Sequence, residues 1–148
     1  MTNNEYINAY KKTQQSSNTV SSSHEIVRAL MKELINSMNK IVLDIQADRK
    51  NEDLHILVNK NLKTDKALKK SKNFSKALSI IYGLQTSLDF DKALEIATNL
   101  FQLYEYCRNQ IIKGFSQNIE DGIIKAIEII KEIMGGWEEI PSLERKDG

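Results

Sequence analysis

Apolar residues recur at helical spacing along the first half of the chain, with polar residues between them. From residue 23 to about 48 the apolar side chains lie three, four and seven positions apart, which is the period of one helix face. They are Ile26, Val27, Leu30, Met31, Leu34, Ile35, Met38, Ile41, Val42 and Ile45. A second helical pattern is clearest from Phe74 to Leu88 and extends back to Asp65. We therefore predict two long amphipathic helices, joined by a segment around 51–63 that lacks sustained periodicity.

Two more helices are predicted in the second half. The third covers about 92–115, and the fourth begins near residue 121 and continues to Trp137. Asp89 or Asp91 is a candidate N-cap for the third helix, and Asn118 with Asp121 indicates the start of the fourth. We expect the pair Gly135-Gly136 to weaken the last turn. Four amphipathic helices with short connections predict an all-α fold, an antiparallel four-helix bundle with a short N-terminal arm.

Both ends of the chain lie outside this periodic pattern. Residues 1–21 are rich in Ser, Thr, Asn and Gln, with Tyr6, Ile7 and Tyr10 as large anchors, so we expect a mobile arm there. Ser22 and Glu25 have the spacing of a capping box, which indicates the start of the first helix. The charged residues after Pro141 are expected to be disordered. The predicted organisation is an arm at 1–21, one helical domain at 22–140 and a tail at 141–148.

Composition narrows the class of protein. A length of 148 residues fits one domain with its own core. The net charge of +1 predicts no polyanionic partner. The single cysteine, Cys107, excludes an intramolecular disulfide and suits a reducing cytosol. No apolar run has the length of a membrane span, so no membrane insertion is expected.

The residues that usually carry chemistry are few and scattered. His24 and His55 are the only histidines, and they lack the spacing and partners of a zinc site. Cys107 shares an apolar helix face with Tyr104 and Ile111, so we interpret it as a buried structural thiol. The sequence contains no phosphate-binding glycine loop and no hydrolase or metalloprotease motif. We predict that the protein is not an enzyme and uses no metal or cofactor.

A run of lysines has two interpretations. The residues are Lys60, Lys63, Lys66, Lys69, Lys70, Lys72 and Lys76, accompanied by one acidic residue, Asp65. A nucleic-acid surface usually adds arginines for bidentate contacts and aromatic residues for stacking, whereas this run has only Phe74. The run is therefore more typical of a solvated linker and helix start.

The helices carry more apolar surface than a minimal core requires. A core-facing stripe is a little over about 100° wide, whereas the first and third helices have apolar arcs of roughly 180°. On the fourth helix, Ile124 and Ile129 lie outside the main stripe. Tyr106 points roughly 200° away from Tyr104 on an ideal helix. Tight packing of a bundle accounts for wide arcs, and so does a groove for an amphipathic partner helix, so both explanations stay open.

Five short motifs follow one another along the chain: Tyr6-Ile-Asn-Ala-Tyr10, Leu88-Asp-Phe-Asp91, Ile96-Ala-Thr-Asn-Leu100, Leu103-Tyr-Glu-Tyr106 and Trp137 near the end of the last helix. In this order they resemble the FliS family of flagellar secretion chaperones. Together they extend over nearly the whole chain. The segment from about 47 to 70 is longer than the family pattern leads us to expect, and it coincides with the lysine run.

The resemblance implies a bacterial cytosolic protein that binds the C-terminal helical segment of flagellin, prevents its premature polymerisation and delivers it to the flagellar export apparatus. No nucleic acid is implied, and a homodimer stays open. The expected partner-binding residues are Tyr6, Ala9, Tyr10, Ile96, Leu100, Phe101, Leu103, Tyr104, Tyr106, Ile124 and Ile129. The alternative is a generic helical adaptor or self-associating bundle that binds another amphipathic or acidic partner.

The N-terminal arm and the central insertion have separate expected roles. Tyr6 and Tyr10 lie one helical turn apart in a polar stretch that is too short to form a stable helix alone. The arm is therefore expected to dock as a displaceable lid over the groove, or else to contact flagellin directly. The segment Asn51–Lys63 matches no family motif and is expected to be dispensable for binding.

Overall fold

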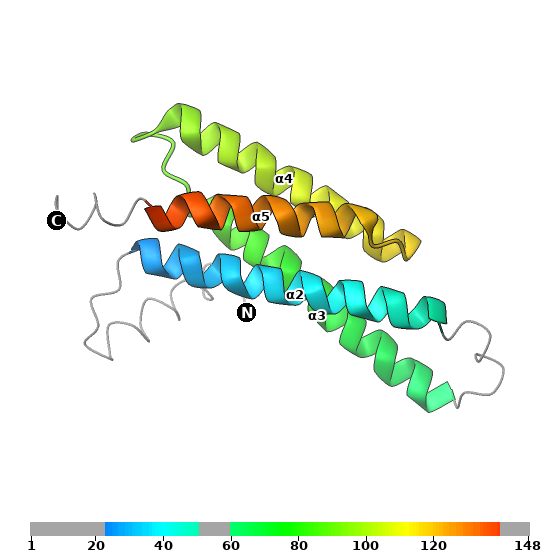
Figure 1. Ribbon diagram of the computed structural model, residues 1–148. Helices are drawn as coiled ribbons and strands as arrows, with labels where there is room; N and C mark the ends of the chain where they lie inside the picture. The colour runs from blue at the N-terminus through cyan, green and yellow to red at the C-terminus, as the bar shows by residue number, and fades with distance from the viewer. Residues whose placement is uncertain (1–22, 51–59, 140–148) are drawn as a thin grey trace, which may run out of the picture.

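Four helices form an antiparallel bundle in the computed structural model, which describes residues 23–50 and 60–139. The helices are α2 (Ser23–Lys50), α3 (Lys60–Thr86), α4 (Leu94–Gln117) and α5 (Asp121–Glu139). Successive helices run in opposite directions, and α5 packs between α2 and α4 (Figure 1). These described ranges contain no strand, so the predicted all-α fold is confirmed.

All four helices contribute side chains to one apolar core. Helix α2 supplies the largest share and packs against α3, α5 and, more weakly, α4. Its contacts with several neighbours account for the wide apolar arc on the first helix, because each neighbour covers a different part of the arc. The largest side chains that are almost fully buried are Leu30, Met31, Leu34, Met38, Ile41, Ile45, Ile80, Ile81, Leu84, Tyr104, Ile111 and Ile123.

Helix α3 begins earlier than the sequence pattern indicated. It starts at Lys60, whereas apolar periodicity extended back only to Asp65. Every side chain from Asp65 to Lys69 is exposed, including Leu68, so this part of the helix buries no apolar stripe. Lysine, leucine and alanine have good intrinsic helix propensity, which is invisible to a search for periodicity. The prediction of a linker over residues 60–63 is therefore wrong, while residues 51–59 lie outside the described part of the chain.

The connection from α3 to α4 uses Asp89 as a turn residue. Its Oδ1 accepts hydrogen bonds from the backbone N–H groups of Asp91 and Lys92, at 3.0 and 3.1 Å. Helix α4 then starts at Leu94, and its N-cap, Ala93, makes no side-chain capping bond. Neither Asp89 nor Asp91 is the N-cap, so that prediction is wrong. Aspartate favours turns by the same side-chain-to-backbone bonding that favours N-caps, and the sequence alone does not separate the two uses.

A tight turn joins α4 to α5. Asn118 ends α4 in the left-handed conformation, with φ 59° and ψ 42°, and its N–H bonds to the carbonyl oxygen of Gly114. Asn118 is thus a C-cap and not a helix start, because asparagine tolerates this conformation better than most residues. The first residue of α5 is Asp121. A Cβ on Gly114 would lie 2.6 Å from Ile123 Cδ1 and 2.7 Å from the Ile119 carbonyl oxygen, so glycine permits the close approach of the two helices.

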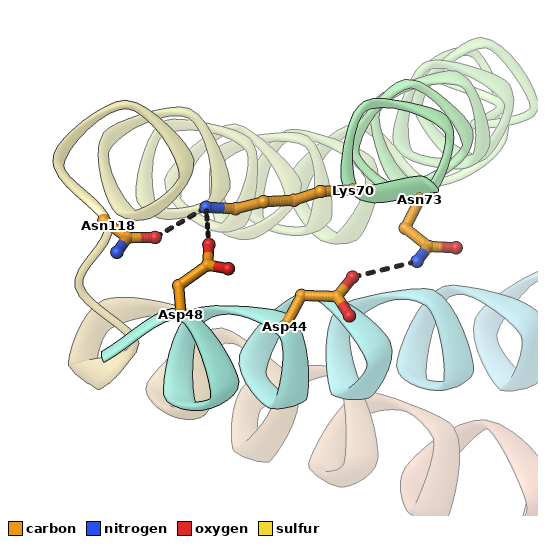
Figure 2. Close-up of polar contacts among 5 residues, drawn as sticks. All are labelled: Asp44, Asp48, Lys70, Asn73 and Asn118. Carbon is orange, nitrogen blue, oxygen red and sulfur yellow. Dashed lines mark hydrogen bonds and ion pairs between the residues drawn. The ribbon is translucent and has the colours of Figure 1, made fainter. Parts of the chain in front are cut away.

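Polar contacts fasten α2, α3 and the α4–α5 turn at one end of the bundle. Lys70 Nζ donates to Asp48 Oδ2 at 3.1 Å and to Asn118 Oδ1 at 2.5 Å, as Figure 2 shows. Asn73 donates to Asp44 at 3.3 Å one turn along the same interface. Part of the lysine run is therefore structural, and the prediction of a purely solvated segment is wrong for Lys70.

An aromatic contact closes the opposite end, where α2 begins and α5 ends. The rings of His24 and Trp137 stack with centroids 4.9 Å apart and planes 9° from parallel. His24 Nε2 donates to the Trp137 carbonyl at 2.6 Å, and Trp137 Nε1 donates to the His24 carbonyl at 3.0 Å. Helix α5 continues through Gly135 and Gly136 to Glu139, so the expected weak last turn still belongs to the helix.

Candidate functional site

Helix α4 carries apolar residues on its exposed side as well as in the core. Its buried stripe consists of Ala97, Tyr104, Cys107, Ile111 and Gly114, at helical spacing. The exposed large apolar residues of the helix are Leu94, Ile96, Phe101, Leu103 and Tyr106. A helix that is apolar well beyond its buried stripe exposes surface that a monomeric protein has little reason to keep.

One flank of α4 faces α5. Ile96, Leu103 and Tyr106 share this flank with Gln110, because the positions lie seven, ten and fourteen residues apart. The side chain of Gln110 lies directly against Gly122 of α5. On α5, the half-buried Ile129 lies seven residues after Gly122 and on the same helix face.

These four residues define one surface. Exposed fractions are 63% for Ile96, 39% for Leu103 and 40% for Tyr106. We call Ile96, Leu103, Tyr106 and Ile129 the α4–α5 apolar surface. It contains four of the residues that the sequence singled out for partner binding.

The other flank of α4 faces α3. Gln85 of α3 donates to the Phe101 carbonyl at 3.5 Å and to Glu105 Oε1 at 3.2 Å, which places Phe101 on the α3 side. Phe90, in the turn before α4, packs against Phe101 with centroids 6.2 Å apart. Leu94, 66% exposed, lies seven residues before Phe101 on the same face. Phe101 therefore belongs to a second exposed apolar cluster, separate from the α4–α5 apolar surface.

Two of the predicted binding residues belong to the interior. The Tyr104 side chain is 1% exposed, and Leu100 is partly buried against the core. Burial, with a smaller effect from the neighbouring Cys107, raises the pKa of the Tyr104 hydroxyl. Tyr104 therefore does not line a surface in this conformation. Its helix spacing, which matches that of Ile111, indicated a core position, whereas the family motif suggested partner binding.

The remaining predicted residues do not join the α4–α5 apolar surface. Ile124, 37% exposed, lies four residues after Glu120, and Glu120 pairs with Arg49 of α2. Ile124 is therefore on the α2 side of α5, away from Ile129. Tyr6, Ala9 and Tyr10 lie outside the described residues. Whether a partner contacts any of these side chains stays a prediction.

Phe90 is an exposed apolar residue that the sequence reasoning missed. It lies in the turn before α4, where helix periodicity cannot predict which side chains are buried, and it is 40% exposed. The only available signal was an aromatic side chain between two aspartates, which is unusual in a polar turn.

The side chains that could react or bind a metal have structural roles in this fold. Cys107 is fully buried, its Sγ lies 3.8 Å from the Ala126 carbonyl, and burial raises its pKa to about 12. A thiol in this state is a poor nucleophile at neutral pH, which confirms the interpretation of a buried structural thiol. His24 is buried, and its ring stacks on Trp137. Over residues 23–50 and 60–139, no three His, Cys, Asp or Glu side chains are grouped to hold a metal.

No helix in the described ranges combines the length and the apolar character that a membrane span requires.

Comparison with known proteins identifies what this bundle resembles. The family described as "Flagellar protein FliS" matches residues 6–144. The flagellar secretion chaperone FliS of Vibrio cholerae is 32% identical over 136 residues, which cover 91% of this chain and 88% of that protein.

Two shorter matches agree. The flagellar secretion chaperone FliS of Salmonella typhimurium is 35% identical over 72 residues, 48% of this chain and 53% of that protein. The flagellar secretion chaperone FliSB of Pseudomonas aeruginosa is 32% identical over 65 residues, 44% of this chain and 52% of that protein.

Proposed function

The chain belongs to the FliS family of flagellar proteins, and from this membership we propose that it is a cytosolic export chaperone for flagellin. It binds the C-terminal helical segment of flagellin, prevents early polymerisation and presents the subunit to the flagellar export apparatus. The function is one of binding, without catalysis, metal or cofactor. The single observation that supports it is the α4–α5 apolar surface, which is exposed at Ile96, Leu103 and Tyr106.

The chemistry of this surface suits an amphipathic helix. Three apolar side chains follow one flank of α4, and Ile129 of α5 borders them, so a partner helix has an apolar floor along its length. Such a partner folds as it binds, because the apolar contacts offset the entropy of ordering it. Burial of one large aliphatic side chain contributes about 1.5–3 kcal/mol.

Titration calorimetry with full-length and C-terminally truncated flagellin tests the proposal. We expect binding to full-length flagellin and little binding to the truncated form. The variant Ile96→Ser with Leu103→Ser should weaken binding by about thirtyfold or more, since each substitution removes a large apolar contact. Leu43→Ser with Ile119→Ser is the matched control, because both residues are exposed apolar side chains outside this surface. Equal binding of both flagellin forms, or equal losses in both variants, would contradict the proposal.

The N-terminal arm is proposed to act as a lid over the same surface. If the arm covers the surface in part of the molecules, flagellin can bind only the open fraction, and the apparent affinity falls in proportion to that fraction. The variant Tyr6→Ala with Tyr10→Ala should therefore bind flagellin more tightly, while the melting temperature of the bundle changes little. A large loss of affinity with intact folding would instead make the two tyrosines direct ligands.

Salt dependence separates this function from the alternative of an adaptor for acidic partners. Apolar capture of a helix should change little between low and moderate salt, whereas binding through lysines should weaken steeply, because salt screens exposed charges.

A further inference from the structure

The structure divides the lysine run into paired and unpaired residues. Lys70 is held by Asp48 and Asn118, and Lys76 pairs with Glu33 of α2. Lys69 and Lys72 are exposed and make no ion pair with any residue in the described ranges. The sequence cannot make this distinction, because all of these lysines share one stretch of helix.

The contacts between α2 and α3 place Lys40 of α2 near the lysine run of α3. Asn73 of α3 bonds to Asp44 of α2, and the two helices are antiparallel. One turn earlier on α2 is Lys40, which therefore lies beside the turn of α3 that carries Lys76. Lys40 is also exposed and makes no ion pair within the described part of the chain.

Two exposed leucines border the same outer surface. Leu43 lies three residues after Lys40 on α2 and is 62% exposed, whereas Leu68 lies four residues before Lys72 on α3 and is 58% exposed. Neither leucine belongs to the core. Three ammonium groups between two apolar side chains form an amphipathic surface, which we call the α2–α3 basic surface (Lys40, Leu43, Leu68, Lys69 and Lys72).

We propose that the α2–α3 basic surface is a second docking site, and that its partner is an acidic amphipathic protein segment. Carboxylates on the partner would pair with the lysines, while leucine-like side chains would pack on Leu43 and Leu68. Nucleic acid is a poorer fit, because the surface has no arginine for bidentate contacts and no aromatic side chain for stacking. The nearby Asp65 reduces the positive charge, so the apolar contacts are required for a useful affinity.

This second site lies apart from the α4–α5 apolar surface and is independent of the proposed flagellin site. The basic surface is on the outward side of the α2–α3 pair, whereas the apolar surface is built on α4 and α5. Two partners of different chemistry would therefore bind together rather than compete.

A labelled peptide of repeated Leu-Glu-Glu units is the probe, and the matching Leu-Gln-Gln peptide is its control. We expect the full chain to bind the glutamate peptide at least fivefold more tightly, and the difference to disappear near 1 M salt, where the Debye length is about 3 Å. The variant Lys40→Gln, Lys69→Gln, Lys72→Gln should lose that difference. The matched control is Lys113→Gln, Lys125→Gln, Lys131→Gln, which removes the same charge from exposed sites on α4 and α5 and should keep it.

Two further measurements test whether the peptide binds at the α2–α3 basic surface. Amide chemical shifts of the unmodified protein should respond to the peptide over 40–47 and 65–76, whether or not the variants fold. The leucine variant Leu43→Ser with Leu68→Ser should also weaken binding. Equal losses in both lysine variants, shifts that map elsewhere, or tighter binding to polyuridine RNA or phosphatidylglycerol vesicles would overturn the proposal. Flagellin titrated onto the peptide complex should bind with unchanged affinity. Absence of peptide binding would therefore contradict only the second docking site and leave the proposed function standing.

Discussion

Gly114 of α4 and Gly135 of α5 differ in whether their surroundings leave room for a side chain. Gly114 lies where α4 approaches Ile123 and the Ile119 carbonyl, whereas a Cβ on Gly135 would meet nothing within 4 Å. We expect Gly114→Ala to lower the free energy of unfolding by about 1–3 kcal/mol, because the extra methyl group must displace packed atoms. Gly135→Ala should leave it unchanged or raise it by up to about 1 kcal/mol, since alanine is the better helix former. Urea denaturation measures both, and equal effects would exclude close packing as the reason for Gly114.

Asn118 combines a backbone role with a side-chain role. Its backbone is left-handed, and its Oδ1 accepts a hydrogen bond from Lys70. Asn118→Gly removes only the side-chain contact, while Asn118→Ala also strains the backbone. We expect the alanine variant to be less stable than the glycine variant by about 1 kcal/mol, as judged from thermal unfolding. Identical stabilities would mean that the left-handed conformation carries no cost there.

The His24–Trp137 contact is a test at the scale of elements, since it joins the start of α2 to the end of α5. We expect His24→Ala to lower the free energy of unfolding by about 1–2 kcal/mol, through loss of the stacked ring and its hydrogen bond. The emission of Trp137, the only tryptophan, should shift to longer wavelength as the indole meets water. His24→Phe restores a ring without the Nε2 donor and should recover part of the loss. Unchanged emission in His24→Ala would contradict the observed stacking.

Hydrophobic periodicity in the sequence predicted some features of the helices and missed others. Periodicity located the helices, the buried positions of α2 and the burial of Cys107, because all three follow from which residues share a helix face. It placed the start of α3 at Asp65 instead of Lys60, because the sequence of residues 60–64 has no apolar repeat. It also grouped Ile124 with Ile129, although they face different neighbours. Helix spacing gives directions around one axis but does not say which helix lies on each side.

The proposed partner surface was only partly predictable for the same reason. Ile96, Leu103 and Tyr106 were expected to bind the partner, and all three are exposed on α4, although the sequence pattern marked only Tyr106 as lying off the core stripe. Phe101 was also expected to bind the partner, and it lies on the α3 side of α4 with Phe90. Tyr104 was selected from a motif although its spacing indicated the core. A motif marks residues that matter to a family without separating those that hold the fold from those that meet a partner.

At the scale of the whole molecule, stability should fall in alkaline solution. The pKa of Cys107 is about 12 in the folded protein and that of Tyr104 is also raised, chiefly because burial disfavours the thiolate and the phenolate. An unfolded cysteine ionises near pH 8.5, so above about that pH the unfolded chain releases protons that the folded chain retains. The contribution is fully present below pH 8.5 and is lost as the pH rises toward 12.

Denaturant unfolding at pH 7.5 and pH 10.5 measures this loss, and Cys107→Ala should reduce the difference between the two values. Reaction of Cys107 with a disulfide reagent at pH 8 should be no faster than global unfolding, because the thiol is fully buried. Rapid labelling of the native protein would show that the core opens locally around α4.

The contact between His24 and Trp137 has a consequence for synthesis on the ribosome. The two residues are separated by 113 positions, so α2 cannot complete its packing with α5 until almost the entire chain has emerged. The tight α4–α5 turn, in contrast, brings together residues close in sequence and costs little loop entropy to close. Helix α2 is therefore synthesised before the other three helices, and the part of its apolar face that α5 covers stays exposed until α5 has emerged. During translation α2 is thus a partly uncovered amphipathic helix, the same kind of segment that we propose the folded protein binds in flagellin.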